Sequence, residues 1–154
     1  MATRSNIAII LKEEDKARVF AELNERLEEV GGRFRYGVDN GNVLQIYCHW
    51  DGYPEGVGED LLRDFNSYDK ALKLILEGDH STPYEPYTGR GEDWVSNRPD
   101  QRTEPKCEEE YLYVFKDGEW KMPTGDDDYE DLVYEDLVDE DGYCAIKDYL
   151  DRDF

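Results

Sequence analysis

The chain has 154 residues, with 39 acidic side chains against 18 lysines and arginines and a formal net charge of −21. This length suits one compact domain and is too short for two comfortable ones. The charge argues against direct binding to nucleic acid or to an anionic membrane, and it favours a basic protein surface as partner.

Composition and termini narrow the class further. Twelve tyrosines and three tryptophans offer enough ring surface to build a core, which argues against plain disorder. The N-terminal sequence MATRSNIAII has no long apolar run, so we expect neither a signal peptide nor a membrane-spanning helix. The three scattered cysteines, Cys48, Cys107 and Cys144, fit a reducing cytoplasm better than a disulfide framework.

The first third of the chain predicts a strand, a helix and a hairpin. Residues 5–11 form a continuous apolar run typical of a buried strand, and residues 13–30 have the periodicity of an amphipathic helix that ends at Gly31-Gly32. Residues 33–38 and 43–50 are strand-like and flank the turn sequence DNGN, which predicts a hairpin. The apolar positions of the helix are Ala17, Phe20, Ala21, Leu23, Leu27 and Val30.

The middle of the chain predicts two short helices and then an irregular stretch. The helices cover residues 58–66 and 67–79, with Ser67 as the N-cap of the second. Residues 79–108 are polar and contain four prolines, which is typical of a long loop or arm.

The remainder predicts a hairpin that turns at Asp117-Gly118 and a final helix over residues 145–154. We expect that helix to dock through Ile146, Tyr149 and Leu150. The whole pattern predicts an α+β fold in one compact domain, with antiparallel hairpins and several short helices. Residues 1–123 form its main part, and residues 124–154 form a strongly acidic C-terminal segment that ends in the short helix.

Acidic residues are concentrated near the C-terminus. Residues 1–123 carry 26 acidic and 16 basic side chains, whereas residues 124–154 carry 13 acidic and 2 basic ones. Between positions 126 and 141, ten of sixteen residues are Asp or Glu, and none is Lys or Arg. The pentapeptide YEDLV occurs twice in succession there, at 129–133 and 134–138.

The sequence IYCHWDGYPEGVG, residues 46–58, is dense in chemically reactive and turn-forming residues. Cys48 and His49 are adjacent, so in a strand they point to opposite faces and do not form a nucleophile–base pair with each other. The other histidine, His80, lies far away in sequence. A Cys48/His80 or His49/His80 arrangement stays open in space, although a buried packing cysteine is the commoner outcome.

The sequence contains no known motif for binding a metal or a cofactor. Zinc sites use Cys and His in paired short spacings, which are missing here, and DDDYEDLVYEDL lacks the pattern of an EF-hand calcium loop. GYPEGVGED ends in acids that would repel a phosphate, and no GxGxxG or P-loop is present. We therefore expect no metal and no cofactor.

A rigid corner explains this stretch better than a catalytic loop. Asp51-Gly52 is a turn dipeptide, Pro54 fixes φ, and Gly56 and Gly58 let the chain enter the next helix. The alternative is a small ligand site or enzyme site in which aromatic rings, one histidine and one carboxylate position a small polar molecule. Its residues would be Cys48, His49, Trp50, Asp51 and Tyr53.

Two segments resemble a family of small uncharacterised proteins of bacteria and their phages. The segments are TRSNIAI, residues 3–9, and YCHWDGYPEGVGEDLL, residues 47–62, so the resemblance covers about the first half of the chain. It implies a bacterial or phage context and no mechanism. The helix over 13–30 and the high acidity after residue 123 depart from the family pattern.

The function that these features favour is that of an acidic interaction protein, phage-encoded, in the host bacterial cytoplasm. Its carboxylates would mimic the DNA or RNA phosphate backbone and so inhibit a basic nucleic-acid-binding host protein, such as a defence nuclease. Two tyrosines would add contact area. The expected partner-binding residues are Asp126, Asp127, Asp128, Glu130, Asp131, Glu135, Asp136, Asp139, Glu140, Asp141, Tyr129 and Tyr134.

Overall fold

The central strand, β1 (Ser5–Ile10), is almost wholly buried and is paired along both edges in the computed structural model, which describes residues 2–123 and 142–151. On one side it pairs antiparallel with β2 (Val43–Cys48), and on the other it pairs parallel with β6 (Tyr111–Lys116). The run SNIAII has no polar alternation because both faces of this strand are covered. The predicted buried strand is confirmed.

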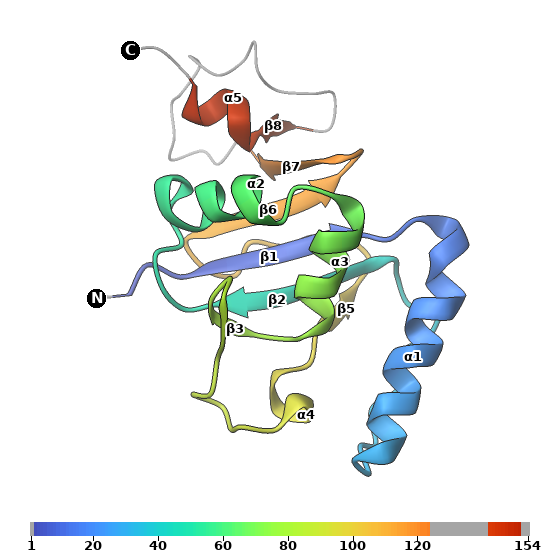
Figure 1. Cartoon of the computed structure of the whole chain (residues 1–154). Coiled ribbons are helices and arrows are strands. Elements are labelled where there is room, and N and C mark those ends of the chain that lie inside the picture. The colour runs from blue at the N-terminus through green and yellow to red at the C-terminus, as the bar shows by residue number, and fades with distance from the viewer. Residues whose placement is uncertain (1, 124–141, 152–154) are drawn as a thin grey trace.

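The other strands extend this centre into a mixed eight-stranded sheet (Figure 1). Its order is β4-β3-β2-β1-β6-β7-β8, and β5 also pairs with β2. The outer strands are β3 (His80–Thr82), β4 (Glu85–Pro86), β5 (Asp100–Arg102), β7 (Glu119–Pro123) and β8 (Tyr143–Ala145). Together with the helices they form one compact α+β domain, as the sequence predicts.

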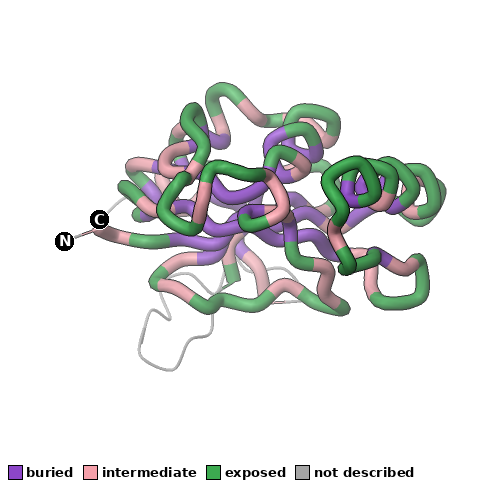
Figure 2. Tube along the Cα trace, turned by 90° about the horizontal axis from the view of Figure 1, so that it is seen from below, coloured by how far each residue is buried: buried purple, intermediate pink, exposed green. Residues whose placement is uncertain are grey.

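Three helices cover one face of the sheet: α1 (Lys16–Glu29), α2 (Glu59–Asp64) and α3 (Tyr68–Leu76). Their apolar sides meet alternate residues of the central strands, such as Ile7 and Ile9 of β1. Figure 2 shows buried residues concentrated in the middle of the molecule, between exposed segments on either side. The main hydrophobic core therefore lies between these helices and the sheet.

The local helix signals are confirmed with small shifts. A 3₁₀ turn, η1 (Glu13–Asp15), leads into α1, and Gly31 ends that helix with a φ of 75°. The Ser67 hydroxyl accepts from the Lys70 amide and caps α3. The buried side of α1 differs slightly from the prediction, because Val19 is buried whereas Ala17, Ala21 and Val30 are exposed.

The second predicted hairpin is present and the first is not. Strands β6 and β7 pair around Asp117 and Gly118, which both have positive φ. Residues 33–38, by contrast, form no strand. The hairpin prediction was wrong because β2 pairs with β1 on one side, while β5 and β3 share its other side.

Residues 33–38 are held instead by Tyr36. The Asn24 amide brackets its backbone, since Nδ2 donates to the Tyr36 carbonyl and Oδ1 accepts from the Tyr36 amide. The Tyr36 ring is stacked on Phe20, and its hydroxyl donates to the carbonyl of Pro99 at 2.6 Å. Burial raises the pKa of this hydroxyl above its ordinary value. A side chain therefore anchors the segment where the sequence predicted a strand ladder.

The polar stretch 79–108 contains β3, β4, β5 and a helical turn, α4 (Trp94–Asn97). Further on, β8 pairs with β7, and the short helix α5 (Ile146–Leu150) docks through the fully buried Ile146. Leu150 packs against the same core, in agreement with the predicted docking. The strands before and after the acidic residues 126–141, β7 and β8, thus belong to one sheet.

The bracket at Asn24 yields a stability prediction. In Asn24→Ala the buried backbone of Tyr36 loses both partners, so we expect the free energy of unfolding to fall by about 1–3 kcal/mol. We also expect faster hydrogen exchange at the Tyr36 amide. Glu25→Ala, an exposed change on the same helix, should leave both quantities nearly unchanged. Equal stability of the two variants by urea unfolding would contradict the proposed anchor.

Candidate functional site

The corner that follows β2 is held by three hydrogen bonds, one within the corner, one to Thr3 and one to the side chain of Tyr113. Asp51 has a φ of 54°, and its carbonyl accepts from the Val57 amide at 2.8 Å. The Gly52 amide donates to the carbonyl of Thr3 at 2.9 Å, and the Gly52 carbonyl accepts from the buried hydroxyl of Tyr113. The chain then enters the π-helical turn η2 (Pro54–Gly58). These bonds fix the corner against β1 and β6.

The side chains of the corner point in different directions. Cys48 is fully buried in the core on the helical side, and burial raises its thiol pKa to about 12. Trp50 is 47% exposed, and the Tyr53 hydroxyl donates to Asp51 Oδ1 at 3.3 Å. The five residues of the alternative ligand site therefore do not converge on one pocket.

The structure places Cys48 and His80 opposite each other as partners in the parallel pairing of β2 and β3. His80 Nδ1 donates to the carbonyl of Gly78 at 2.6 Å, and Nε2 lies 3.6 Å from Glu77 Oε1. Burial lowers the pKa of His80, so both the imidazole and the thiol are held in their neutral forms. This geometry suits a packed interior and does not activate the thiol.

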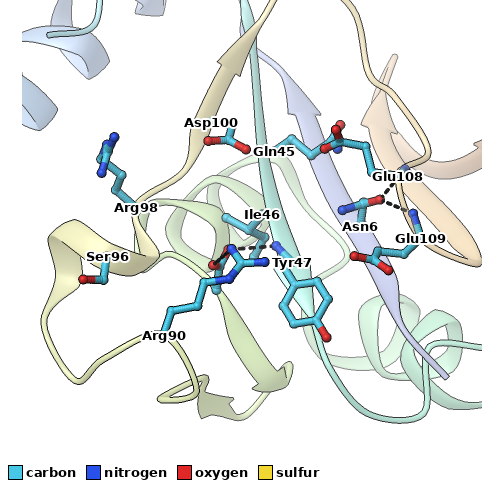
Figure 3. A pocket seen from close by; sticks show the side chains of 11 residues that line it. Asn6, Gln45, Ile46, Tyr47, Arg90, Ser96, Arg98, Asp100, Glu108 and Glu109 are labelled. Carbon is cyan, nitrogen blue, oxygen red and sulfur yellow. Dashed lines mark hydrogen bonds and ion pairs between the residues drawn. The ribbon is translucent and has the colours of Figure 1, made fainter. Parts of the chain in front are cut away.

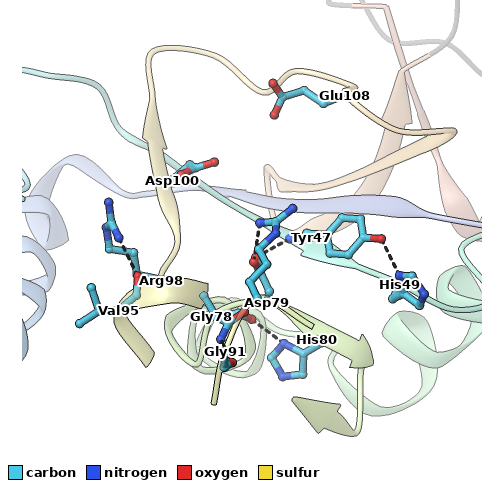
Figure 4. A network of polar contacts seen from close by, with 12 residues as sticks. Tyr47, His49, Gly78, Asp79, His80, Gly91, Val95, Arg98, Asp100 and Glu108 are labelled. Atoms are coloured by element: carbon cyan, nitrogen blue, oxygen red, sulfur yellow. Dashed lines mark hydrogen bonds and ion pairs between the residues drawn. The ribbon is translucent and has the colours of Figure 1, made fainter. Parts of the chain in front are cut away.

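His49 instead joins an aromatic cluster with Tyr47, Trp50 and Tyr87. Figure 4 shows its contact with Tyr47. Its Nδ1 lies 2.6 Å from the Tyr47 hydroxyl, which donates to it when the imidazole proton is on Nε2. The imidazole is stacked on Tyr87, with ring centroids 5.2 Å apart, and Trp50 meets its edge at 4.6 Å. Tyr47 and Tyr87 also meet edge to face. The cluster locks the orientation of His49.

Asp79 is the buried charge beside this cluster. It is 5% exposed, its Oδ1 accepts from the Tyr47 amide at 2.9 Å, and its Oδ2 accepts from Arg90 Nη1 at 2.9 Å. Burial raises the pKa of Asp79 to about 6, and the Tyr47 amide and the Arg90 guanidinium only partly offset this shift. The Arg90 guanidinium also lies over the Tyr47 ring, 5.0 Å from its centroid.

A polar hollow of about 220 Å³ opens next to Asp79 and Arg90 (Figure 3). It lies on the face of the sheet opposite α1, α2 and α3. Asn6 and Gln45 line it from the two central strands, and Glu108 and Glu109 line it from the segment before β6. Its lining contains four carboxylates and two guanidinium groups, so this hollow is highly polar and carries charges of both signs.

Two side-chain amides tie the segment before β6 across this face. Gln45 Nε2 donates to the Lys106 carbonyl at 2.7 Å, and Gln45 Oε1 accepts from the Lys106 amide at 3.0 Å. Asn6 Oδ1 accepts from the backbone amides of Glu108 and Glu109 at 2.8 and 3.1 Å. The wall of the hollow is thus built on rigid strands.

Of the five residues of the predicted ligand site, His49 and Trp50 belong to the aromatic cluster found in the structure. The predicted partner-binding residues, 126–141, lie outside the described residues. Sequence reasoning missed Tyr47, Asp79, Tyr87 and Arg90. The available signals were Asp79 beside His80 and an arginine between two glycines in GRG. Neither signal indicates that Asp79 and Arg90 would lie beside Tyr47 of β2.

The chain matches no protein-family model, no curated protein and no solved structure. The resemblance to small bacterial and phage proteins therefore stays an expectation. Within residues 2–123 and 142–151, no group of three or more His, Cys, Asp or Glu side chains is placed to hold a metal ion. The same described ranges contain no helix with both the length and the apolar character needed to cross a bilayer.

The corner is testable at Gly56. A Cβ atom added there would lie 2.3 Å from the Asp51 carbonyl oxygen, so Gly56→Ala must shift the backbone. We expect a loss of about 1–3 kcal/mol in the free energy of unfolding. Gly58→Ala is the matched control, because its Cβ would make an ordinary contact of 3.4 Å with Ile146. If both variants unfold at the same urea concentration, the corner is not rigid.

Asp79 yields a pH prediction. Its pKa is raised by folding, so between about pH 4 and pH 6 the folded protein binds more protons than the unfolded chain, and stability falls as pH rises. Relative to Asp79→Asn, the natural protein should lose about 2 kcal/mol of stability from about pH 4 to pH 7. Chemical unfolding across this range measures the difference. Glu92→Gln, an exposed change nearby, should follow the natural protein, and a flat difference for Asp79→Asn would refute the shift.

Proposed function

We propose that this protein is an acidic interaction protein that binds a basic, nucleic-acid-binding protein by presenting carboxylates in place of phosphates. A partner that evolved to hold the phosphate backbone has a basic groove, and a dense row of carboxylates gains the same counterion-linked attraction. The acidic run 126–141 carries this role, with Tyr129 and Tyr134 as contact residues.

The observation that carries the proposal is the position of this run in the chain. It connects β7 to β8, which pair antiparallel with Pro123 opposite Tyr143 and Met122 opposite Cys144. Both ends of the connection are therefore attached to the same edge of the sheet. The ten carboxylates therefore lie, in sequence, within a connection whose two ends are tied to paired strands of the folded domain.

In the described part of the chain, several acidic side chains form ion pairs with arginines. Asp15 and Glu22 pair with Arg18, and Asp60 and Asp64 pair with Arg63. Positions 126–141 contain no lysine or arginine with which to form such pairs. A run of ten carboxylates with no basic residue inside it favours a basic protein surface as partner.

The biological setting of the proposal rests on the resemblance to bacterial and phage proteins. A phage-encoded inhibitor of a host defence nuclease, acting in the bacterial cytoplasm, has the required partner: a basic protein with a nucleic-acid groove. Blocking that groove needs no chemistry on the inhibitor's side, only complementary charge and contact area.

The test compares two variants of equal net charge in pull-downs from bacterial lysate at low and high salt. One replaces the ten acids of 126–141 by Asn or Gln. We expect the natural protein to retain a nucleic-acid-binding protein that duplex DNA displaces and that salt elutes, and we expect this variant to lose it. The other variant replaces ten exposed acids elsewhere by Gln and should still retain the nucleic-acid-binding protein. These acids are Glu13, Glu14, Glu22, Glu25, Glu28, Glu29, Glu55, Glu85, Glu92 and Glu104.

A third variant separates the proposal from the ligand-site alternative at the corner. His49→Ala removes the imidazole from the aromatic cluster and leaves the acidic run intact. Capture of the same DNA-displaceable protein by His49→Ala agrees with mimicry. The proposal fails if the protein with the neutralised run captures its partner as well as the natural protein does, or if DNA does not compete.

A further inference from the structure

We propose that the polar hollow beside Asp79 and Arg90 is a binding site for a small zwitterion of the α-amino-acid class, with Asn6, Arg90 and Glu109 as its recognition groups. This site lies outside the acidic run, and the inference does not depend on the function proposed above.

Asn6 supplies the first observation. It is 5% exposed, and its Oδ1 accepts from two backbone amides, so the orientation of the side-chain amide is set by the segment before β6. The Nδ2 group consequently points the other way, into the hollow (Figure 3). Among the residues that the structure describes, none accepts a hydrogen bond from it. A donor on a rigid strand that lines an open hollow is available to bind an external acceptor.

Arg90 supplies a second donor at the same place. Its Nη1 bonds to Asp79, which holds the guanidinium at the hollow, and the N–H groups of its other nitrogens remain for a ligand. A guanidinium and an amide N–H together suit a carboxylate. The buried carboxylate of Asp79 and the ring of Tyr47 keep Arg90 in position.

Glu109 supplies the opposite charge. Its backbone is fixed by Asn6, and its side chain lines the hollow. Burial is the main cause of the raised pKa of Tyr47, and the Glu109 carboxylate contributes to the same shift. Asp100 and Glu108 add acidic character to the same lining, and both lie beside Arg102. An ammonium group of the ligand would meet Glu109.

The mixture of charges selects the ligand class. A simple anion would face four lining carboxylates, and a simple cation would face Arg90 and leave the Asn6 donor unused. A molecule with a carboxylate at one end and an ammonium at the other satisfies both ends. An α-amino acid is the smallest common molecule of this kind, and the hollow has space for only a few heavy atoms beyond it.

The experiment is an NMR titration of the full chain with each of the twenty standard L-amino acids, read at the Asn6 side-chain NH₂ signals. We expect saturable shifts for at least one amino acid, with a Kd below about 10 mM. The best binder is then compared with its carboxamide, which lacks the carboxylate, and with the analogue that lacks the α-amino group. Both should bind at least about tenfold more weakly.

Two variants and one control connect the signal to the residues. Asn6→Asp keeps an acceptor for the amides of Glu108 and Glu109 and replaces the donor by a negatively charged oxygen, which repels the ligand carboxylate. The fold should persist while affinity falls about tenfold or more. Glu109→Gln should weaken binding, and Glu92→Gln, which changes a charge outside the lining, should not. For the variants, shifts of backbone amides around the hollow are read.

Three results would overturn the inference. These are the lack of a saturable shift with any of the twenty amino acids, equal binding of the carboxamide or of the deaminated analogue, and unchanged affinity in a folded Asn6→Asp protein. Because no lysate partner is involved, failure here leaves the charge-mimicry proposal standing, and the converse also holds.

Discussion

The burial of β1 on both faces is the constraint on which the rest of the structure depends. A strand with no access to water must pair its backbone groups on both edges, and β2 and β6 provide those partners. The resulting register sets Asn6 opposite Tyr47 and Ser5 opposite Cys48. One residue of slip would turn Asn6 into the helical core and expose Ile7, so the same pairing that stabilises the sheet also determines where its polar groups lie.

The two faces of the sheet have different roles as a result. The face under α1, α2 and α3 is apolar and holds Cys48 as a packing residue. Among the described residues, the buried apolar side chains of the opposite face cluster at Ala8, Val43, Leu112 and Val114, and the face becomes polar toward Asn6, Gln45 and Tyr47. On this face the side-chain amides of Gln45 and Asn6 bind backbone groups of the segment before β6, as a neighbouring strand would do. Polar side chains can therefore occupy this face without replacing apolar residues of the main hydrophobic core, which lies on the helical face.

Electrostatics divides the molecule in a similar way. Within the described domain, buried charges such as Asp79 have a specific partner, and many surface acids lie beside arginines. The acidic run between β7 and β8 has no basic residue of its own. Of the net charge of −21, ten negative charges fall in this one connection and are not distributed along the strands and helices of the described domain.

Local signals were sufficient for most elements of this protein. A continuous apolar run predicted β1, and apolar periodicity predicted α1. Gly31 and Ser67 marked helix ends, and Asp117-Gly118 predicted the β6–β7 turn. The charge of residues 126–141 is likewise a property of sequence alone. These features depend on residues within one or two turns of each other, and for that reason they can be read without tertiary structure.

Tertiary structure alone decided the pairings. The DNGN turn favoured a hairpin at β2, but competition among β1, β3 and β5 for the edges of that strand left residues 33–38 to be held by Asn24. The hollow likewise combines Asn6, Asp79, Arg90 and Glu109 from segments up to about a hundred residues apart. Long-range strand order sets such contacts, and it depends on which pairing buries the most apolar surface, a quantity that no local sequence pattern contains.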